Sequence, residues 1–160
     1  MSPGDMTIRR ADLNDALEMA RLAAELGYPI PASEMERRLE RLLRDSRHYI
    51  VVAPAADGRL LGWMHVEHRT SIEGGDRAEL MGLVVDSTAR RRGIGRELID
   101  VAENWISAKG LSELTVRSNI ARQSSHPFYE GLGYVRSKTQ HVYIKAVRPR
   151  SPGDEGTRTE

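Results

Sequence analysis

The stretch that organises the chain is LMGLVVDSTARRRGIGRELIDVAENWISAK, residues 80–109. Its first six residues are mostly apolar, which predicts a strand, and Asp86 ends this run. Arginines and glycines follow as RRRGIG at residues 90–95. Beyond them apolar residues recur at helical spacing, and Gly110 stands where a helix C-terminus favours glycine. The predicted order is therefore strand, basic glycine-containing loop and amphipathic helix.

That order favours an anion-binding site. The first amides of a helix have no partner within the helix, and the aligned peptide dipoles leave about half a positive charge there. Glycines let a ligand approach the backbone, and arginines add charge around it. We expect a phosphate or pyrophosphate to bind at the loop, whose residues are Arg90, Arg91, Arg92, Gly93, Ile94, Gly95 and Arg96.

Two common phosphate-binding loops do not fit this pattern. A P-loop needs lysine followed by serine or threonine after its last glycine, whereas Arg96 and Glu97 follow Gly95. A dinucleotide-binding fingerprint needs a third glycine or alanine at position 98, which is Leu98.

The loop that remains, with Leu83 and Val85 in the strand before it, resembles the acetyl-CoA loop of the GNAT N-acetyltransferase superfamily. The resemblance covers residues 6–147 and implies a mixed α/β sheet of seven strands, with a V-shaped split between strands 4 and 5 and four flanking helices. It implies acetyl-CoA as co-substrate, with its pyrophosphate on the loop. Its pantetheine arm would lie in the split, against the amides of Leu83, Val84 and Val85. The family often has proline where this chain has Ser87.

The periodicity along the chain is consistent with that fold. Strands are expected at 6–10, 48–53, 60–69, 77–86 and 111–118, with two more within 134–147. Helices are expected after Asp12 as far as Gly27, from Ser33 to about Asp45, through residues 94–109, and at 124–132. Asp12 is the expected N-cap of the first helix, and Ser33 with Glu36 fits a capping box for the second. Only one clear strand–helix–strand crossover is visible, which favours a mixed sheet.

A second motif, SSHPFYEGLGY at residues 124–134, resembles the family's element around a catalytic tyrosine. The resemblance implies that Tyr129 protonates the departing thiolate, since a phenol of pKa about 10 stays protonated at pH 7. It places Phe128 beside the cofactor, although a core position is the simpler interpretation. Asn119 matches an asparagine that bonds the pantetheine amides. Packed or ordinary loop positions are the alternatives for Tyr129 and Asn119.

Glu79 is the candidate general base. It lies eleven residues before Arg90, the spacing of a catalytic glutamate in the histone acetyltransferase branch of the family. The role requires that partial burial raise its pKa. A solvated or ion-paired side chain is the alternative, with His65 and Glu67 or ordered water as other bases. The five histidines are scattered and none has helical metal-ligand spacing, so we expect no metal.

Composition sets the remaining bounds. A length of 160 residues predicts one domain, here residues 1–147, followed by a disordered tail at 148–160 that lacks large apolar residues. The net charge of +1 argues against a nucleic-acid partner. The absence of cysteine excludes disulfides and a thiolate nucleophile. No apolar run or leader suggests a membrane or secretory segment, so a cytoplasmic protein is expected.

These observations favour direct transfer of acetyl from acetyl-CoA to a primary amine in a ternary complex. The acceptor loops expected from the resemblance, residues 28–33 and 70–76, carry or adjoin acidic residues that suit a cationic small molecule such as an aminoglycoside or polyamine. These acids are Glu25, Glu34, Glu73 and Asp76. A protein N-terminal or lysine acetyltransferase and a non-catalytic acyl-CoA sensor are the alternatives. A homodimer is expected only by analogy with the family.

Overall fold

The computed structural model describes residues 7–117 and 125–153. The chain forms two compact units, residues 1–123 and 124–160. The elements of the first unit are β1 (Arg9–Arg10), η2 (Leu13–Asp15), α1 (Ala16–Glu25), α2 (Ala32–Leu43), β2 (His48–Pro54), β3 (Leu60–Ser71), β4 (Gly75–Val85), η3 (Ser87–Ala89), α3 (Ile94–Ala108) and β5 (Leu114–Val116). The second unit contains α4 (Ser125–Gly131). In the part of the chain that the structure describes, every helix is too short or too polar to span a bilayer.

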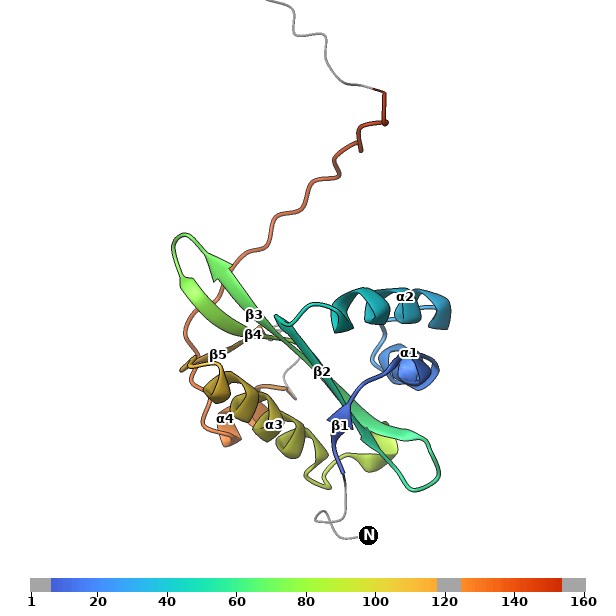
Figure 1. The fold of residues 1–160 in the computed structure, drawn as a ribbon. Helices are drawn as coiled ribbons and strands as arrows, with labels where there is room; N and C mark the ends of the chain where they lie inside the picture. Colours follow the sequence, from blue (N-terminus) through green and yellow to red (C-terminus); the bar gives the residue numbers. More distant parts are fainter. Residues whose placement is uncertain (1–6, 118–124, 154–160) are drawn as a thin grey trace, which may run out of the picture. The chain divides into compact units, whose positions relative to one another are not determined.

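The first unit is built on a mixed five-stranded sheet in the order β1-β2-β3-β4-β5. Neighbours from β1 to β4 are antiparallel, and β5 pairs parallel with β4 after the crossover through α3. Helices α1 and α2 lie on one side of the sheet and α3 on the other (Figure 1). The parallel pairing is short, because it joins only residues 78–80 of β4 to residues 114–116 of β5. Beyond Leu80 no described residue of β5 pairs with β4.

The main core fills the space between the sheet and the α1–α2 pair. Side chains of α1 and α2 pack against the alternate residues of β2 that face them, and the members of this core include Met19, Leu22, Leu39, Ile50 and Val52. Each such side chain contributes roughly 1.5–3 kcal/mol when it is buried. The Trp63 indole packs against this cluster, and its Nε1 donates to Met19 O at 3.3 Å.

Two glycines allow close packing on either face of the sheet. On the α3 side, a Cβ built at Gly62 would stand 2.8 Å from Val84 O and 3.2 Å from Leu98 Cδ1, so only glycine admits the helix there. On the α1–α2 side, a Cβ at Gly82 would stand 2.8 Å from the Trp63 ring. The same strand pair therefore accepts a helix on one face and an indole on the other.

The two predicted helix caps have different outcomes. Asp12 does cap the first helical segment, because Asn14 N donates to its Oδ1 at 2.8 Å and Asp15 reaches back to the Asp12 amide at 2.9 Å. The capping box from Ser33 to Glu36 is wrong. Helix α2 begins one residue earlier, after Pro31, and no side chain caps it. Pro31 has φ −56° but an extended ψ of 142°, so it precedes the first helical turn and supplies no side-chain acceptor to it.

The expected seven strands are not found among the described residues. Residues 134–147 contain no strand, and their apolar side chains are exposed: Val135, Val142, Tyr143, Ile144 and Val147. Alternation shows that a segment suits a strand, but a strand forms only where a neighbour supplies hydrogen bonds along its edge. That neighbour is distant in the sequence and alternation does not specify it.

Candidate functional site

The loop between β4 and α3 has a backbone shaped for anion binding. Arg91 is left-handed with φ 66°, and Gly93 is the helix N-cap with φ 79°. The first amide bonded within α3 is that of Glu97, which donates to Gly93 O at 3.0 Å. No side chain caps the helix. The amides of Ile94, Gly95 and Arg96 therefore remain for a ligand.

The charge at this loop is positive and exposed. Arg90, Arg91, Arg92 and Arg96 are all exposed. Within residues 7–117 and 125–153, no hydrogen bond or ion pair holds any of these four guanidiniums. Together with the partial positive charge of the helix N-terminus, they form a site that suits a multiply charged anion. No group of three or more acidic or histidine side chains in those ranges could hold a metal ion.

The open edge of β4 supplies further donors next to this loop. Asp86 N donates to Leu61 O at 2.8 Å, and Val84 is the register partner of Trp63. In an antiparallel pair, hydrogen-bonded residues alternate along each strand. Val84 therefore bonds β3, whereas the amides of Leu83 and Val85 point toward the edge that β5 leaves unpaired. Of the three strand amides expected to contact a ligand, those of Leu83 and Val85 therefore point away from β3, whereas that of Val84 bonds it.

Glu79 lies in the sheet with only 6% of its surface exposed. Its Oε2 accepts from Arg69 Nη1 at 2.6 Å, and its Oε1 accepts from Arg117 Nε. Burial pushes the pKa of this carboxyl upward, but the two guanidiniums outweigh burial and hold the pKa below its usual value. The raised pKa that the base role requires is thus not found, although Glu79 does lie where β4 pairs with β5.

A polar strip runs along the same face of β2 and β3. His48 Nδ1 and His65 Nε2 lie 2.9 Å apart, and Glu67 Oε1 lies 4.0 Å from His48 Nε2. Burial first, and the neighbouring His48 second, lower the pKa of His65 to about 4. His65 is therefore a neutral imidazole at pH 7. It lies opposite Gly82 of β4 in the register, and Glu79 belongs to the same strand β4.

Tyr129 lies on α4 in the second unit. Its ring makes edge contacts with Phe128 and Tyr134 at centroid distances of 5.1 and 6.0 Å. Burial raises the pKa of the Tyr129 phenol, so it holds its proton more firmly than a free tyrosine. Phe128 is partly exposed. Asn119 lies outside the described residues.

Sequence reasoning missed one conspicuous group next to the loop. Arg21 of α1 joins Glu18, Glu25 and Asp86, and Asp86 is only 3% exposed at the end of β4. The spacing of Glu18, Arg21 and Glu25 by three and four residues is typical of helix ion pairs. That spacing would have identified the helical partners, but not Asp86, which is 65 residues away.

Comparison with known proteins identifies the family to which this chain belongs. The model of the acetyltransferase (GNAT) family matches residues 13–134, and the chain belongs to that family. The aminoglycoside N(6')-acetyltransferase type 1 of Stenotrophomonas maltophilia is 27% identical over 147 residues, which are 89% of this chain and 95% of that protein. The predicted family is thereby confirmed.

Solved structures share the fold. The aminoglycoside 6'-N-acetyltransferase AAC(6')-Ih of Acinetobacter baumannii superimposes with a TM-score of 0.79 at 18% identity, over 89% of this chain and 99% of that one. AAC(6')-Iy in complex with the bisubstrate analog CoA-S-monomethyl-acetylneamine gives a TM-score of 0.78 at 22% identity, with the same coverage of 89% and 99%.

Proposed function

We propose that this chain transfers the acetyl group of acetyl-CoA to a primary amine of a small molecule, aminoglycoside-like or polyamine-like, by direct attack in a ternary complex. The observation that carries the proposal is the start of α3, where unpaired amides and four exposed, unengaged arginines face outward. The names of the relatives support the substrate class, since several are aminoglycoside acetyltransferases.

Each part of acetyl-CoA has a proposed set of contacts. The pyrophosphate accepts hydrogen bonds from the amides at the start of α3, and the arginines at 90, 91, 92 and 96 balance its charge. The amides of Leu83 and Val85 hold the pantetheine arm and polarise the thioester carbonyl. Asn119 and Phe128 are assigned to the same arm by the family resemblance.

The proposed chemistry is addition of the amine nitrogen to the thioester carbon, followed by cleavage of the carbon–sulfur bond. Glu79 takes the ammonium proton through water, and the Tyr129 phenol gives its proton to the departing thiolate. The lowered pKa of Glu79 keeps it ionised but makes it a weak base, and its two arginine partners offset its negative charge. His65, a neutral imidazole on the neighbouring strand, is the second candidate for that proton, but its pKa of about 4 makes it a weak base too.

The acidic residues beside the acceptor loops contribute less than expected. Glu25 pairs with Arg21, Glu34 pairs with Arg37 and Arg38, and Asp76 bonds His68 and Thr70. Of these four acids, only Glu73, which is exposed at the β3–β4 turn, has no hydrogen bond or ion pair among the described residues. Any attraction of a cationic acceptor by these acids therefore depends chiefly on Glu73.

An amine panel tests the function. Release of CoA thiol from acetyl-CoA is measured with aminoglycosides, polyamines and peptides bearing lysine or a free N-terminus. We expect turnover with the small cationic amines and acetylated product by mass spectrometry. Turnover only with peptides would reassign the protein as a protein acetyltransferase, and CoA binding without turnover on any amine would favour an acyl-CoA sensor.

A further inference from the structure

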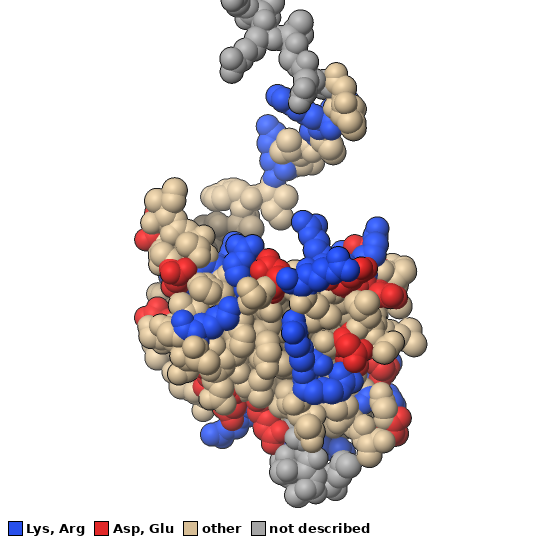
Figure 2. Space-filling model, in the orientation of Figure 1, with Lys and Arg blue, Asp and Glu red and all other residues tan. Residues whose placement is uncertain are grey.

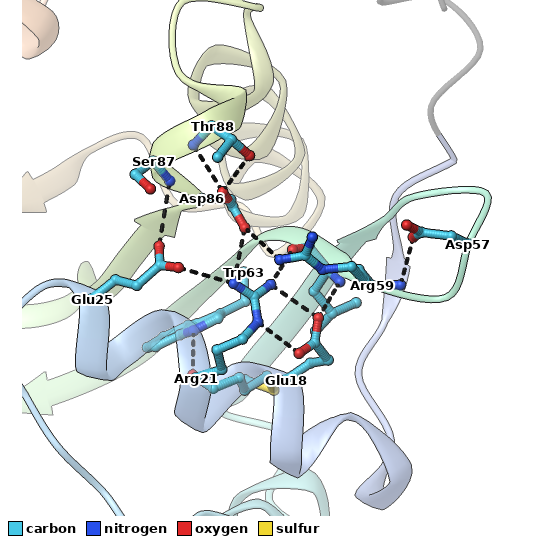
Figure 3. A network of polar contacts seen from close by, with 11 residues as sticks. Glu18, Arg21, Glu25, Asp57, Arg59, Trp63, Asp86, Ser87 and Thr88 are labelled. Atoms are coloured by element: carbon cyan, nitrogen blue, oxygen red, sulfur yellow. Dashed lines mark hydrogen bonds and ion pairs between the residues drawn. The ribbon is translucent and has the colours of Figure 1, made fainter.

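Arg21 ties helix α1 to the residues that begin the proposed cofactor loop. Its guanidinium donates to Glu18 through Nε at 2.7 Å and Nη2 at 3.0 Å, and to Leu60 O at 3.2 Å. Its Nη1 lies 3.0 Å from both Glu25 Oε1 and Asp86 Oδ2 (Figure 3). One side chain therefore joins α1, the start of β3 and the end of β4.

Asp86 is the loop-side partner of this contact. Its Oδ1 accepts from Thr88 N at 2.8 Å and Thr88 Oγ1 at 2.7 Å, which caps η3 (Figure 3). The bonds from Thr88 first, and the Arg21 guanidinium second, lower the pKa of Asp86 to about 2. Glu25 Oε2 also accepts from Ser87 N, at 3.4 Å. Helix α1 thus holds the first two residues after β4.

The rest of the loop has little else to fix it. Between Asp86 and α3, only Ala89 is buried, with 1% of its surface exposed, and the other residues from Ser87 to Gly93 face solvent. A loop that is already ordered before its ligand arrives spares the binding step the entropy of ordering it. The conformation of the anion-binding segment therefore depends on how firmly Asp86 is held.

We propose that Arg21 is a positioning residue for the cofactor loop: by clamping Asp86 to α1 it pre-orders residues 87–93 for the pyrophosphate of acetyl-CoA. The inference rests on the proposed function. Arg21 is not among the residues proposed to contact the cofactor. It differs in this from the loop arginines, which are exposed and are proposed to act by charge.

The chain contains a matched control for this clamp. Arg9 binds Asp15 through two 2.8 Å bonds, Asp15 is only 6% exposed, and it too stabilises the start of a short 3-10 helix. Asp15 lies in η2, which leads into α1 and not into the cofactor loop. Arg9→Met and Asp15→Asn therefore remove the same chemistry at a different place.

The experiment compares Arg21→Met and Asp86→Asn with those two controls in the full chain. Calorimetry measures the Kd for CoA, steady-state kinetics measures KM and kcat, and hydrogen exchange measures the loop amides. We expect all four variants to lose thermal stability. Only the Arg21 and Asp86 variants should raise the Kd for CoA and the KM for acetyl-CoA roughly tenfold, with kcat at saturation kept within about twofold. Their loop amides should exchange faster, and Arg21→Lys should restore part of the affinity.

Two further outcomes decide the inference. The double variant Arg21→Met with Asp86→Asn should be no weaker for CoA than either single variant, because both remove one contact. Equal effects of the Arg21 and Arg9 variants on CoA affinity, or unchanged exchange at residues 87–93, would overturn the clamp. If the unaltered protein fails to bind CoA, the proposed function falls, while faster exchange in the Arg21 variant still establishes that the clamp orders the loop.

Discussion

At Glu79 two physical effects act on one carboxyl in opposite directions. Burial favours the neutral acid, whereas Arg69 and Arg117 favour the carboxylate and prevail. The spacing from Arg90 identified the position, but the two arginines lie 10 and 38 residues away in the chain. The sign of the pKa shift depends on these partners from other strands, so the sequence alone did not reveal it.

The base role of Glu79 has a pH signature. Glu79→Gln keeps the shape and removes the proton acceptor, so kcat/KM at pH 7 should fall about 100-fold. The loss should shrink as the pH approaches the pKa of the acceptor amine, because a neutral amine needs no base. Asp15→Asn serves as the control for loss of a buried carboxylate. An equal loss at every pH would show that Glu79 only holds Arg69 and Arg117 in place.

The lowered pKa of His65 predicts how the free energy of unfolding depends on pH. Its pKa falls from 6.5 in the unfolded chain to about 4 in the folded one, so the unfolded chain binds the proton first. Its contribution is therefore complete above pH 6.5 and is lost as the pH falls toward 4, by up to about 1.4 kcal/mol per pH unit. Urea unfolding between about pH 4.5 and 7 should show a shallower slope for His65→Gln than for the parent.

On the scale of elements, α3 has two glycines with the same backbone requirement at its two ends. Gly93 has φ 79° and Gly110 has φ 76°, and a Cβ at either would meet open space. Alanine in this region costs roughly 1–2 kcal/mol, so both Gly→Ala variants should lower the unfolding free energy similarly. Only Gly93→Ala should weaken CoA binding, by about tenfold, because only it distorts the amides of the proposed anion site. Equal CoA affinities in the two variants, by calorimetry, would contradict that assignment.

The helix α3 also shows what kind of element a sequence specifies well. Its apolar spacing and its flanking glycines are local, and the structure places it at Ile94–Ala108, within one residue of the expected range. Strand β5 is shorter than expected, at three residues, and residues 134–147 form no strand. Strand extent depends on which edge is available, which is decided by contacts distant in the sequence.

For the whole molecule, charge is balanced rather than concentrated. On the face shown in Figure 2, basic and acidic side chains are interspersed, in keeping with a net charge of +1. Long-range attraction of a polyanion therefore contributes little, so the proposed binding of CoA rests on the local amides and arginines at the loop. The family of the chain and the position of the loop at residues 90–96 were predictable, because both follow from a motif of contiguous residues. The clamp from Arg21 to Asp86 and the direction of the Val84 amide were not, because they depend on register and on packing between elements.

The indole that lies over Gly82 gives the protein an internal optical signal. The chain has two tryptophans. The ring of Trp105 stacks on that of Tyr49 with their centroids 5.4 Å apart, and Lys109 Nζ lies over the Trp105 ring. Changing Trp105 to phenylalanine would leave Trp63 as the only tryptophan. Its indole covers Gly82, the neighbour of Leu83 in β4. Binding of acetyl-CoA at the proposed strand edge should then change the intrinsic fluorescence, so that it could be measured without a label or a coupled enzyme.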